Sequence, residues 1–522
     1  MRSDPAGIDC PGRCAATFDD GVVVRLTARP EARNDFAGFG GGCSGPACTV
    51  ELRSDHKVWA TFVERPVTLA VQVEGSGTVT SSPAPIDCPR SCTAAFAAGT
   101  TVVLRQVPAP GYRFAGFRGS CSGDSCALKL ADDAMVLASF VAIPFHKLNV
   151  TLGGSGGGRV TSLPAGIDCP GACSASFAEG TAVALSAAPD VLSRPAKWSG
   201  ACSGPRCAVR IDSDTAVSAQ FDLRRYRVQE LAGVGSFATA ISPHNVEVVG
   251  SLSLVPRSFL WSGAMRFPSP PDGDLRGVND AAVVAGVSMS FHAYRWEGGV
   301  VTDLSHPGEK LSAAEGINRD GVVVGWYLIN NEMRAVAWTS KGAIELGWLS
   351  AVHLSSAYGV NAAGVAVGMS LTNDGQLHPV RFRPGAVDDL GTLGGNRGTA
   401  CGISDSGLIV GESYFDATGV QHGFFYQDGR MVDAGALPGL PYSTLYAVNA
   451  AGLAAGVGFD SSGSKASHAI VYGAGRIDLN TLVDGTDLTI TYAKGVDESG
   501  VIAGGGRRGS DSHAVILWPE ER

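Results

Sequence analysis

The chain has little charge and no long apolar run. Of its 522 residues only 17% are charged, and the formal net charge is −9, with Lys and Arg scattered rather than clustered. A nucleic-acid-binding surface requires a basic patch, so this class of partner is not expected. The longest apolar stretches, such as Val322–Ile329, fall far short of the ~18 residues typical of a membrane span.

Catalytic signatures are missing as well. The sequence has no His-Glu-x-x-His motif and no phosphate-binding loop. Its one Gly-x-Ser-x-Gly match, residues 153–157, lies in a glycine-rich turn rather than at a strand-to-helix elbow. We therefore predict a non-catalytic protein with no cofactor and no metal.

The chain is rich in glycine, with 70 residues, and also contains many β-branched residues. This composition predicts many short strands joined by tight turns. The length predicts several domains.

A cysteine motif occurs three times in the first half. Ile-Asp-Cys-Pro begins at Ile8, Ile86 and Ile167, and each copy continues as Cys-x3-Cys, 28 residues, Cys-x4-Cys, 13 residues and Phe. The twelve cysteines are Cys10, Cys14, Cys43, Cys48, Cys88, Cys92, Cys121, Cys126, Cys169, Cys173, Cys202 and Cys207. The second and third copies follow a predicted strand and the first does not, so we expect a truncated N-terminus; no signal peptide is present.

Local disulfides are the preferred interpretation of these cysteines. Two cysteines that flank a tight turn lie at about the separation a disulfide needs, which favours pairing the first with the second and the third with the fourth. Crossed connectivities stay open. Zinc is the alternative, but structural zinc motifs usually begin with a shorter Cys-x2-Cys knuckle. Disulfides predict an oxidising, extracellular or cell-surface location.

The pattern Ile167-Asp-Cys-Pro with Trp198-Ser-Gly-Ala-Cys-Ser-Gly204 resembles the divergent internalin-type B-repeats of bacterial cell-surface proteins. The resemblance covers residues 1–222. It implies small β-grasp-like units that serve as a stalk or spacer.

The second half repeats a different phrase: small, Ile/Val, Asn/Ser/Asp, two residues, Gly, any residue, Val, any residue, Gly. Its seven copies end at Gly250, Gly286, Gly325, Gly368, Gly411, Gly456 and Gly504. A third strand with an aromatic end and a fourth strand with an acidic residue follow most copies, and four strands in about forty residues are typical of a propeller blade. The seventh copy lacks a fourth strand, and residues 226–231, before the first copy, would supply it and close the ring.

This region resembles the HAF-family extracellular repeat proteins over residues 225–520, through His292-Ala293-Tyr294, His468-Ala469, His513-Ala514 and Asp389–Gly395. The resemblance implies an extracellular location and assigns no activity. We thus predict an all-β chain: three small disulfide-stapled β repeats (1–64, 65–143 and 144–223) followed by a seven-bladed β-propeller (224–522).

The position just before each copy of the repeated phrase carries a larger or polar residue, whereas its neighbours are small or aliphatic. These residues are Thr239, Arg276, Glu315, Tyr358, Cys401, Tyr446 and Lys494. Charged groups cannot all be buried there unpaired, so we expect Arg276, Glu315, Tyr358, Tyr446 and Lys494 to bind a ligand at the mouth of a central channel. Solvated strand ends are the alternative. Cys401 is interpreted as a β-core thiol.

Five histidines share one repeat position: His292, His378, His422, His468 and His513. A shared metal is unfavourable because equivalent outer positions of different blades lie far apart, so each imidazole is expected to bond a neighbouring turn.

These features predict a secreted or cell-surface bacterial repeat protein that binds an extracellular glycan or protein, or acts as a structural module. Scaffolding in envelope assembly is a second reading of the same features. The alternative from a different class is a glycan-processing propeller enzyme whose carboxylates come from different blades. Fold alone does not choose between them.

Overall fold

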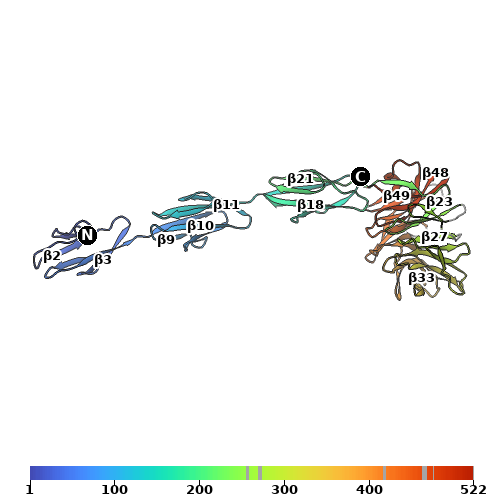
Figure 1. Cartoon of the computed structure of the whole chain (residues 1–522), viewed down its shortest axis with the longest axis horizontal. Coiled ribbons are helices and arrows are strands. Elements are labelled where there is room, and N and C mark those ends of the chain that lie inside the picture. The colour runs from blue at the N-terminus through green and yellow to red at the C-terminus, as the bar shows by residue number, and fades with distance from the viewer. Residues whose placement is uncertain (254–257, 268–272, 416–418, 461–466, 474, 521–522) are drawn as a thin grey trace. The chain divides into compact units, whose positions relative to one another are not determined.

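The computed structural model describes residues 1–253, 258–267, 273–415, 419–460, 467–473 and 475–520. Within this part of the chain, every regular element except the 3₁₀ helix η1 (Leu479–Leu482) is a β-strand, as the arrows in Figure 1 show. Among the described residues, no helix is long and apolar enough to cross a membrane. The all-β prediction is confirmed.

Contacts divide the chain into two compact units. One comprises Met1–Lys147, Ser176–Thr181 and Arg210–Asp214, and the other comprises Leu148–Ala175, Ala182–Val209 and Thr215–Arg522.

Repeats 2 and 3 share one arrangement of two four-stranded sheets, with strand orders β12-β10-β7-β8 and β11-β13-β6-β9 in repeat 2, and β16-β15-β18-β20 and β17-β14-β21-β19 in repeat 3. The strands of repeat 2 are β6 (Val67–Glu74), β7 (Gly77–Ser82), β8 (Asp87–Cys88), β9 (Thr93–Phe96), β10 (Thr101–Pro108), β11 (Tyr112–Gly119), β12 (Cys126–Lys129) and β13 (Ala134–Ala142). Those of repeat 3 are β14 (Phe145–Gly153), β15 (Gly158–Leu163), β16 (Asp168–Cys169), β17 (Ser174–Ala178), β18 (Thr181–Pro189), β19 (Lys197–Gly200), β20 (Cys207–Ile211) and β21 (Thr215–Gln220).

Alternating apolar residues explain these strands. In β10, Val102 and Leu104 are buried while Thr101, Val103 and Arg105 are exposed. Period-two alternation places one face of a strand on a core. The core of repeat 2 lies between its two sheets and includes Cys88 and Cys126.

Repeat 1 has fewer strands. They are β1 (Arg2–Asp4), β2 (Val23–Thr27), β3 (Asn34–Gly41), β4 (Cys48–Glu51) and β5 (Val58–Glu64). They form a sheet of order β1-β2-β4 and a two-stranded sheet of β3 and β5.

The described residues of the C-terminal region form seven four-stranded sheets, numbered 1 to 7. Sheets 1 to 6 take consecutive strands, β23–β26 through β43–β46, and sheet 7 has the order β22-β49-β48-β47. The strands of sheets 1 to 3 are β23 (Ser236–Ile241), β24 (Val248–Leu252), β25 (Ser258–Trp261), β26 (Met265–Arg266), β27 (Gly273–Val278), β28 (Val284–Ser288), β29 (Ala293–Glu297), β30 (Val300–Asp303), β31 (Leu311–Ile317), β32 (Val323–Ile329), β33 (Glu332–Thr339) and β34 (Gly342–Glu345). Those of sheets 4 to 7 are β35 (Ser355–Val360), β36 (Ala366–Leu371), β37 (Leu377–Arg383), β38 (Ala386–Asp389), β39 (Gly398–Ile403), β40 (Ile409–Tyr414), β41 (Gln421–Gln427), β42 (Arg430–Gly435), β43 (Tyr442–Val448), β44 (Ala454–Phe459), β45 (Ser467–Tyr472), β46 (Arg476–Asp478), β22 (Tyr226–Glu230), β47 (Thr489–Val496), β48 (Ile502–Arg508) and β49 (Asp511–Pro519).

The repeated phrase builds two neighbouring strands of each sheet, from β23 and β24 in sheet 1 to β47 and β48 in sheet 7. In sheet 4, the Gly364 amide donates to the Asn361 carbonyl at 3.0 Å, closing the tight turn. The last glycine of the phrase permits close backbone approach, because a Cβ on Gly368 would lie 1.8 Å from the Ser356 carbonyl oxygen. The Asn361 side chain then bridges sheets: its Nδ2 donates to the Ser404 carbonyl of sheet 5 at 3.3 Å.

Adjacent sheets are also joined through buried serines. The Ser355 hydroxyl of sheet 4 accepts the Ala335 amide of sheet 3 at 3.0 Å. The equivalent Ser236 of sheet 1 accepts the Ala514 amide of sheet 7 at 2.8 Å. In sheet 7, β22 pairs antiparallel with β49, so residues from the two ends of the region share one sheet.

Candidate functional site

In each sheet the strand that begins the repeated phrase (β23, β27, β31, β35, β39, β43 and β47) carries a one-residue β-bulge at the same place. The register skips one residue between Ala238 and Ala240 in sheet 1, and between Ala357 and Gly359 in sheet 4. The skipped residues in the seven sheets are Thr239, Arg276, Glu315, Tyr358, Cys401, Tyr446 and Lys494. A bulge re-aims the side chain it displaces, and sequence reasoning had singled out these seven residues without predicting the bulges.

All seven bulge residues line one cavity of about 570 Å³. We call it the central cavity. Its remaining walls are the glycines and aliphatic residues that follow each bulge, such as Gly277 and Val278. The five predicted ligand-binding residues are therefore brought together, in a cavity of the size typical of small-molecule sites.

One side of the central cavity holds a neutralised ion pair. The Arg276 guanidinium donates to the Glu315 carboxylate. The indole Nε1 of Trp326 donates to the same oxygen of Glu315 at 3.1 Å. These contacts fix the carboxylate and compensate its charge.

Lys494 differs from Arg276 because an aromatic ring, and not a carboxylate, lies beside its ammonium group. Its ammonium nitrogen lies 3.4 Å from the centroid of the Tyr446 ring, a cation–π contact. Among the described residues no Asp or Glu lies within ion-pair distance of it. Burial lowers the pKa of Lys494, and an anion in the cavity would oppose that shift.

The prediction that Cys401 is a core thiol is wrong about the location of this residue. It is half-buried and lines the central cavity rather than the packed interior of a sheet, because the bulge turns it inward. Desolvation raises the pKa of Cys401 to about 12, so the thiol is protonated at neutral pH and is a poor nucleophile.

The recurring histidines contact carboxylates rather than turns, which corrects the prediction. The Nδ1 atoms of His378, His422 and His468 lie 2.6–2.9 Å from Asp389, Asp433 and Asp478 on the fourth strands. His292 contacts Glu309 at 3.1 Å, and His513 lies 2.9 Å from Glu230 on β22. A spacing of ten or eleven residues from His to Asp is the sequence signal that could have identified the pairs of His378, His422 and His468.

The twelve repeat cysteines lie in six local pairs at disulfide distance, first with second and third with fourth, with Cα–Cα separations of 4.5–5.7 Å. The pairing agrees with the turn-flanking argument, and Cys401 is the free cysteine of the described chain.

Comparison with known proteins yields one family and distant structural similarities. No curated protein matches the chain. A putative TolB from Agrobacterium tumefaciens is 12% identical, with 55% of this chain and 100% of that chain covered and a TM-score of 0.37. A gluconolactonase, XC5397 from Xanthomonas campestris, is 12% identical, with 56% and 90% covered and a TM-score of 0.28. Two stretches of the chain, residues 67–144 and 148–225, match the family model of the divergent InlB B-repeat domain.

Proposed function

We propose that the chain is a secreted or cell-surface binding protein in which the seven sheets form a closed, seven-bladed β-propeller of HAF-type repeats. Its central cavity binds an acidic saccharide, and the three cysteine repeats serve as spacer units. The observation that carries this proposal is the convergence of seven equivalent bulge residues on one cavity.

Contacts across the ends of the array support a closed ring. Neighbouring sheets 3 and 4 are linked by Ser355 and Ala335, and sheets 1 and 7 are linked in the same way by Ser236 and Ala514. The bulged strands also contact one another from each sheet to the next, and β47 of sheet 7 contacts β23 of sheet 1. A closed ring leaves only short, protected strand edges, which opposes edge-to-edge association.

The charge of the central cavity supports an anionic ligand. Glu315 is compensated by Arg276, whereas Lys494 forms no ion pair among the described residues and lies against the Tyr446 ring. Tyr358 and Tyr446 supply ring faces of the kind that sugar rings contact. A saccharide with a carboxylate would use both features.

An extracellular location is supported by the six cysteine pairs, since such pairs persist in oxidising compartments. A glycan-processing activity would need two carboxylates at one mouth of the ring. Of the described residues that line the central cavity, Glu315 alone is a carboxylate. At a second, smaller cavity, Asp405 and Glu498 each accept a backbone amide of the preceding sheet, from Ala362 and Ala450, which favours a structural role.

The test is binding of the oxidised chain to an array of acidic and neutral glycans. We expect acidic glycans to be retained and Lys494→Met to lower their signal at least tenfold. Lys341→Met, which removes an exposed lysine between β33 and β34, is the matched control and should leave binding unchanged. Absence of binding to every acidic glycan, or binding that Lys494→Met leaves intact, would refute the proposed site.

A further inference from the structure

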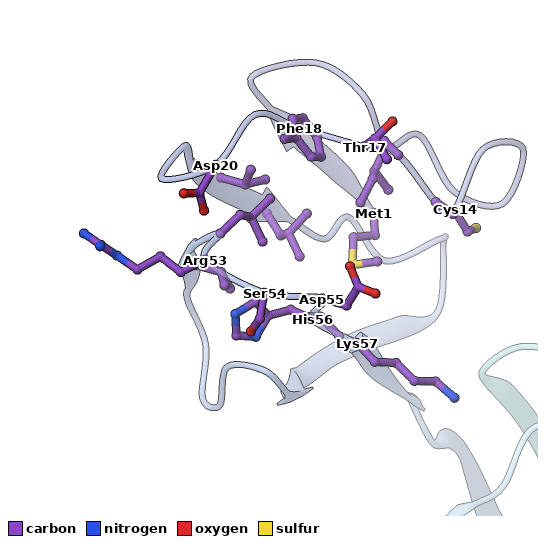
Figure 2. A pocket seen from close by; sticks show the side chains of 18 residues that line it. Met1, Cys14, Thr17, Phe18, Asp20, Arg53, Ser54, Asp55, His56 and Lys57 are labelled. Atoms are coloured by element: carbon purple, nitrogen blue, oxygen red, sulfur yellow. The ribbon is translucent and has the colours of Figure 1, made fainter.

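The central cavity and a cavity in repeat 1 differ in how exposed their charged groups are. The repeat 1 cavity, of about 630 Å³, is lined by the exposed residues Asp20, Arg53, Asp55 and Lys57. The side chains of Arg53 and Lys57 point away from it in Figure 2. In the central cavity, by contrast, the Glu315 side chain is only 12% exposed. A charge acts more strongly on a ligand where water is largely excluded, so the central cavity is the place where charge can select a ligand.

Glu315 uses one of its two carboxylate oxygens within the protein. The Arg276 guanidinium and the Trp326 indole Nε1 both donate to Oε1 of this carboxylate. Its Oε2 accepts no hydrogen bond from any residue that the structure describes. Because the two donors come from sheets 2 and 3, they fix the orientation of the carboxylate and leave Oε2 as a positioned, ionised acceptor.

The ion pair of Glu315 decides which kind of ligand group its free oxygen can take. Arg276 already neutralises the carboxylate, so a cationic ligand group would compete with a guanidinium that is in place. An anionic ligand group would meet an ionised oxygen and be repelled. A neutral hydroxyl group has neither disadvantage and donates a charge-assisted hydrogen bond. Glu315 therefore favours a hydroxyl group of the ligand.

Lys494 supplies the second polar contact, at a separate place in the central cavity. It lies on β47, and contacts between bulged strands run from β47 through β23 and β27 to β31, which carries Glu315. The Glu412 carboxylate on β40 is engaged elsewhere, because Gln421 and Thr444 donate to its Oε2 at 3.1 and 2.7 Å. The ammonium group of Lys494 thus stays available for an anion. A ligand that reaches both Lys494 and Glu315 carries an anionic group and a hydroxyl group at different positions.

We infer that the central cavity selects a singly charged sugar acid of the uronic acid class. The carboxylate of the sugar lies at Lys494, and a hydroxyl group of the same sugar donates to Oε2 of Glu315. A second anionic group on the sugar would meet Glu315 and is disfavoured. Glu315 is thus the specificity-determining residue, and Trp326 is a positioning residue that acts through it. This inference rests on the proposed function, to which it adds the class of acid and the residue that selects it.

Three small probes separate the two contacts. Methyl β-D-glucuronide has a carboxylate and ring hydroxyls, cyclohexanecarboxylate has the carboxylate alone, and methyl β-D-glucoside has the hydroxyls alone. Their affinities for the full-length, oxidised chain are measured by isothermal titration calorimetry. We expect the glucuronide to bind about tenfold more tightly than cyclohexanecarboxylate, which is the usual contribution of one hydrogen bond to a charged group. The glucoside should bind more weakly than the glucuronide because it leaves Lys494 without an anion.

Glu315→Gln tests the residue that selects the sugar. This variant should bind the glucuronide about tenfold more weakly. It should bind cyclohexanecarboxylate at least as tightly as before, because Arg276 is no longer neutralised, and that retained binding shows that its cavity is intact. Trp326→Phe keeps an aromatic ring but loses the indole N–H, so it should lower the ratio of the two affinities by a smaller factor. Lys341→Met is the control and should change neither affinity.

The inference and the proposed function fail in different ways. Equal binding of both acids by the unaltered chain overturns the inference. So does a ratio of affinities that Glu315→Gln leaves unchanged. In either case the anion site still stands if Lys494→Met weakens the binding of both acids. Failure of the unaltered chain to bind either acid, or unchanged binding by Lys494→Met, overturns the anion site and the inference with it.

Discussion

The cysteine repeats and the seven-sheet region stabilise β structure in different ways. Repeat 2 packs one core between its own two sheets and adds two local cysteine pairs. The C-terminal sheets pack on one another instead, as in the cluster that joins Ala285 and Ala293 of sheet 2 to Ala314 and Val336 of sheet 3. Small modules bury too little surface to be stable by packing alone, whereas a series of sheets shares its cores with neighbours.

The largest expected effect comes from reduction. Each cysteine pair closes a loop of only four or five residues, for which chain entropy predicts about 2 kcal/mol, or about 4 kcal/mol for the two pairs of one repeat. Hydrogen exchange of residues 65–143 should therefore accelerate by about three orders of magnitude in reductant. Residues 226–519 should be unchanged, and Cys401→Ser is the control. Equal acceleration in both regions would show that the cysteine pairs do not stabilise the cysteine repeats selectively.

The next largest effect tests whether sheets 1 and 7 are joined in the same way as the other neighbouring sheets. Ser236→Ala and Ser355→Ala each leave a buried amide, of Ala514 or Ala335, without its acceptor. Such a loss costs about 1–3 kcal/mol. Urea unfolding followed by tryptophan fluorescence should show similar losses for both variants. A loss at Ser355 with none at Ser236 would mean that sheets 1 and 7 are not joined as the others are.

A stabilising change is expected at Asp497, which takes the place that Asn449 and Asn361 hold in other sheets. The Nδ2 of Asn449 donates to the Asp497 carbonyl at 2.9 Å, and a carboxylate at position 497 has no such donor to offer. Burial raises the pKa of Asp497 above 3.8, so the folded state holds this proton more tightly and loses stability as pH rises through that window. Asp497→Asn should therefore raise the free energy of unfolding by about 1 kcal/mol at pH 7.

The pH series provides the control for that variant. The advantage of Asp497→Asn should shrink as pH falls through the folded-state pKa and below 3.8, where the carboxyl becomes protonated in both folded and unfolded chains. A gain that is the same at pH 4 and pH 7 would assign the effect to packing instead of charge.

The smallest effect is expected from the histidine pairs on the outer strands. His422 and Asp433 are 19% and 38% exposed, and an exposed pair contributes about 0.2–1 kcal/mol. A double-mutant cycle of His422→Ala and Asp433→Ala should give a coupling in this range at low salt that fades in 1 M salt. A coupling above about 2 kcal/mol would make these pairs, rather than the shared cores, the main link within each sheet.

Local features could be predicted from the sequence more completely than the partners of individual side chains. Turn chemistry and cysteine spacing predicted the Asn361–Gly364 turn and the local cysteine pairs, because both depend on residues a few positions apart. The histidines and the fourth-strand acids were each identified, but their contact was not. That contact depends on two strands pairing with a defined register, as β37 and β38 do around His378 and Asp389.

The sequence by itself determined the all-β class, the two kinds of repeat and the one position that varies among the inner strands, since period, turn residues and spacing act over short stretches of chain. Only the tertiary structure decided where those variable residues point. A bulge turns Lys494 and its six equivalents into one cavity, and a bulge exists only when a strand is paired with its neighbour.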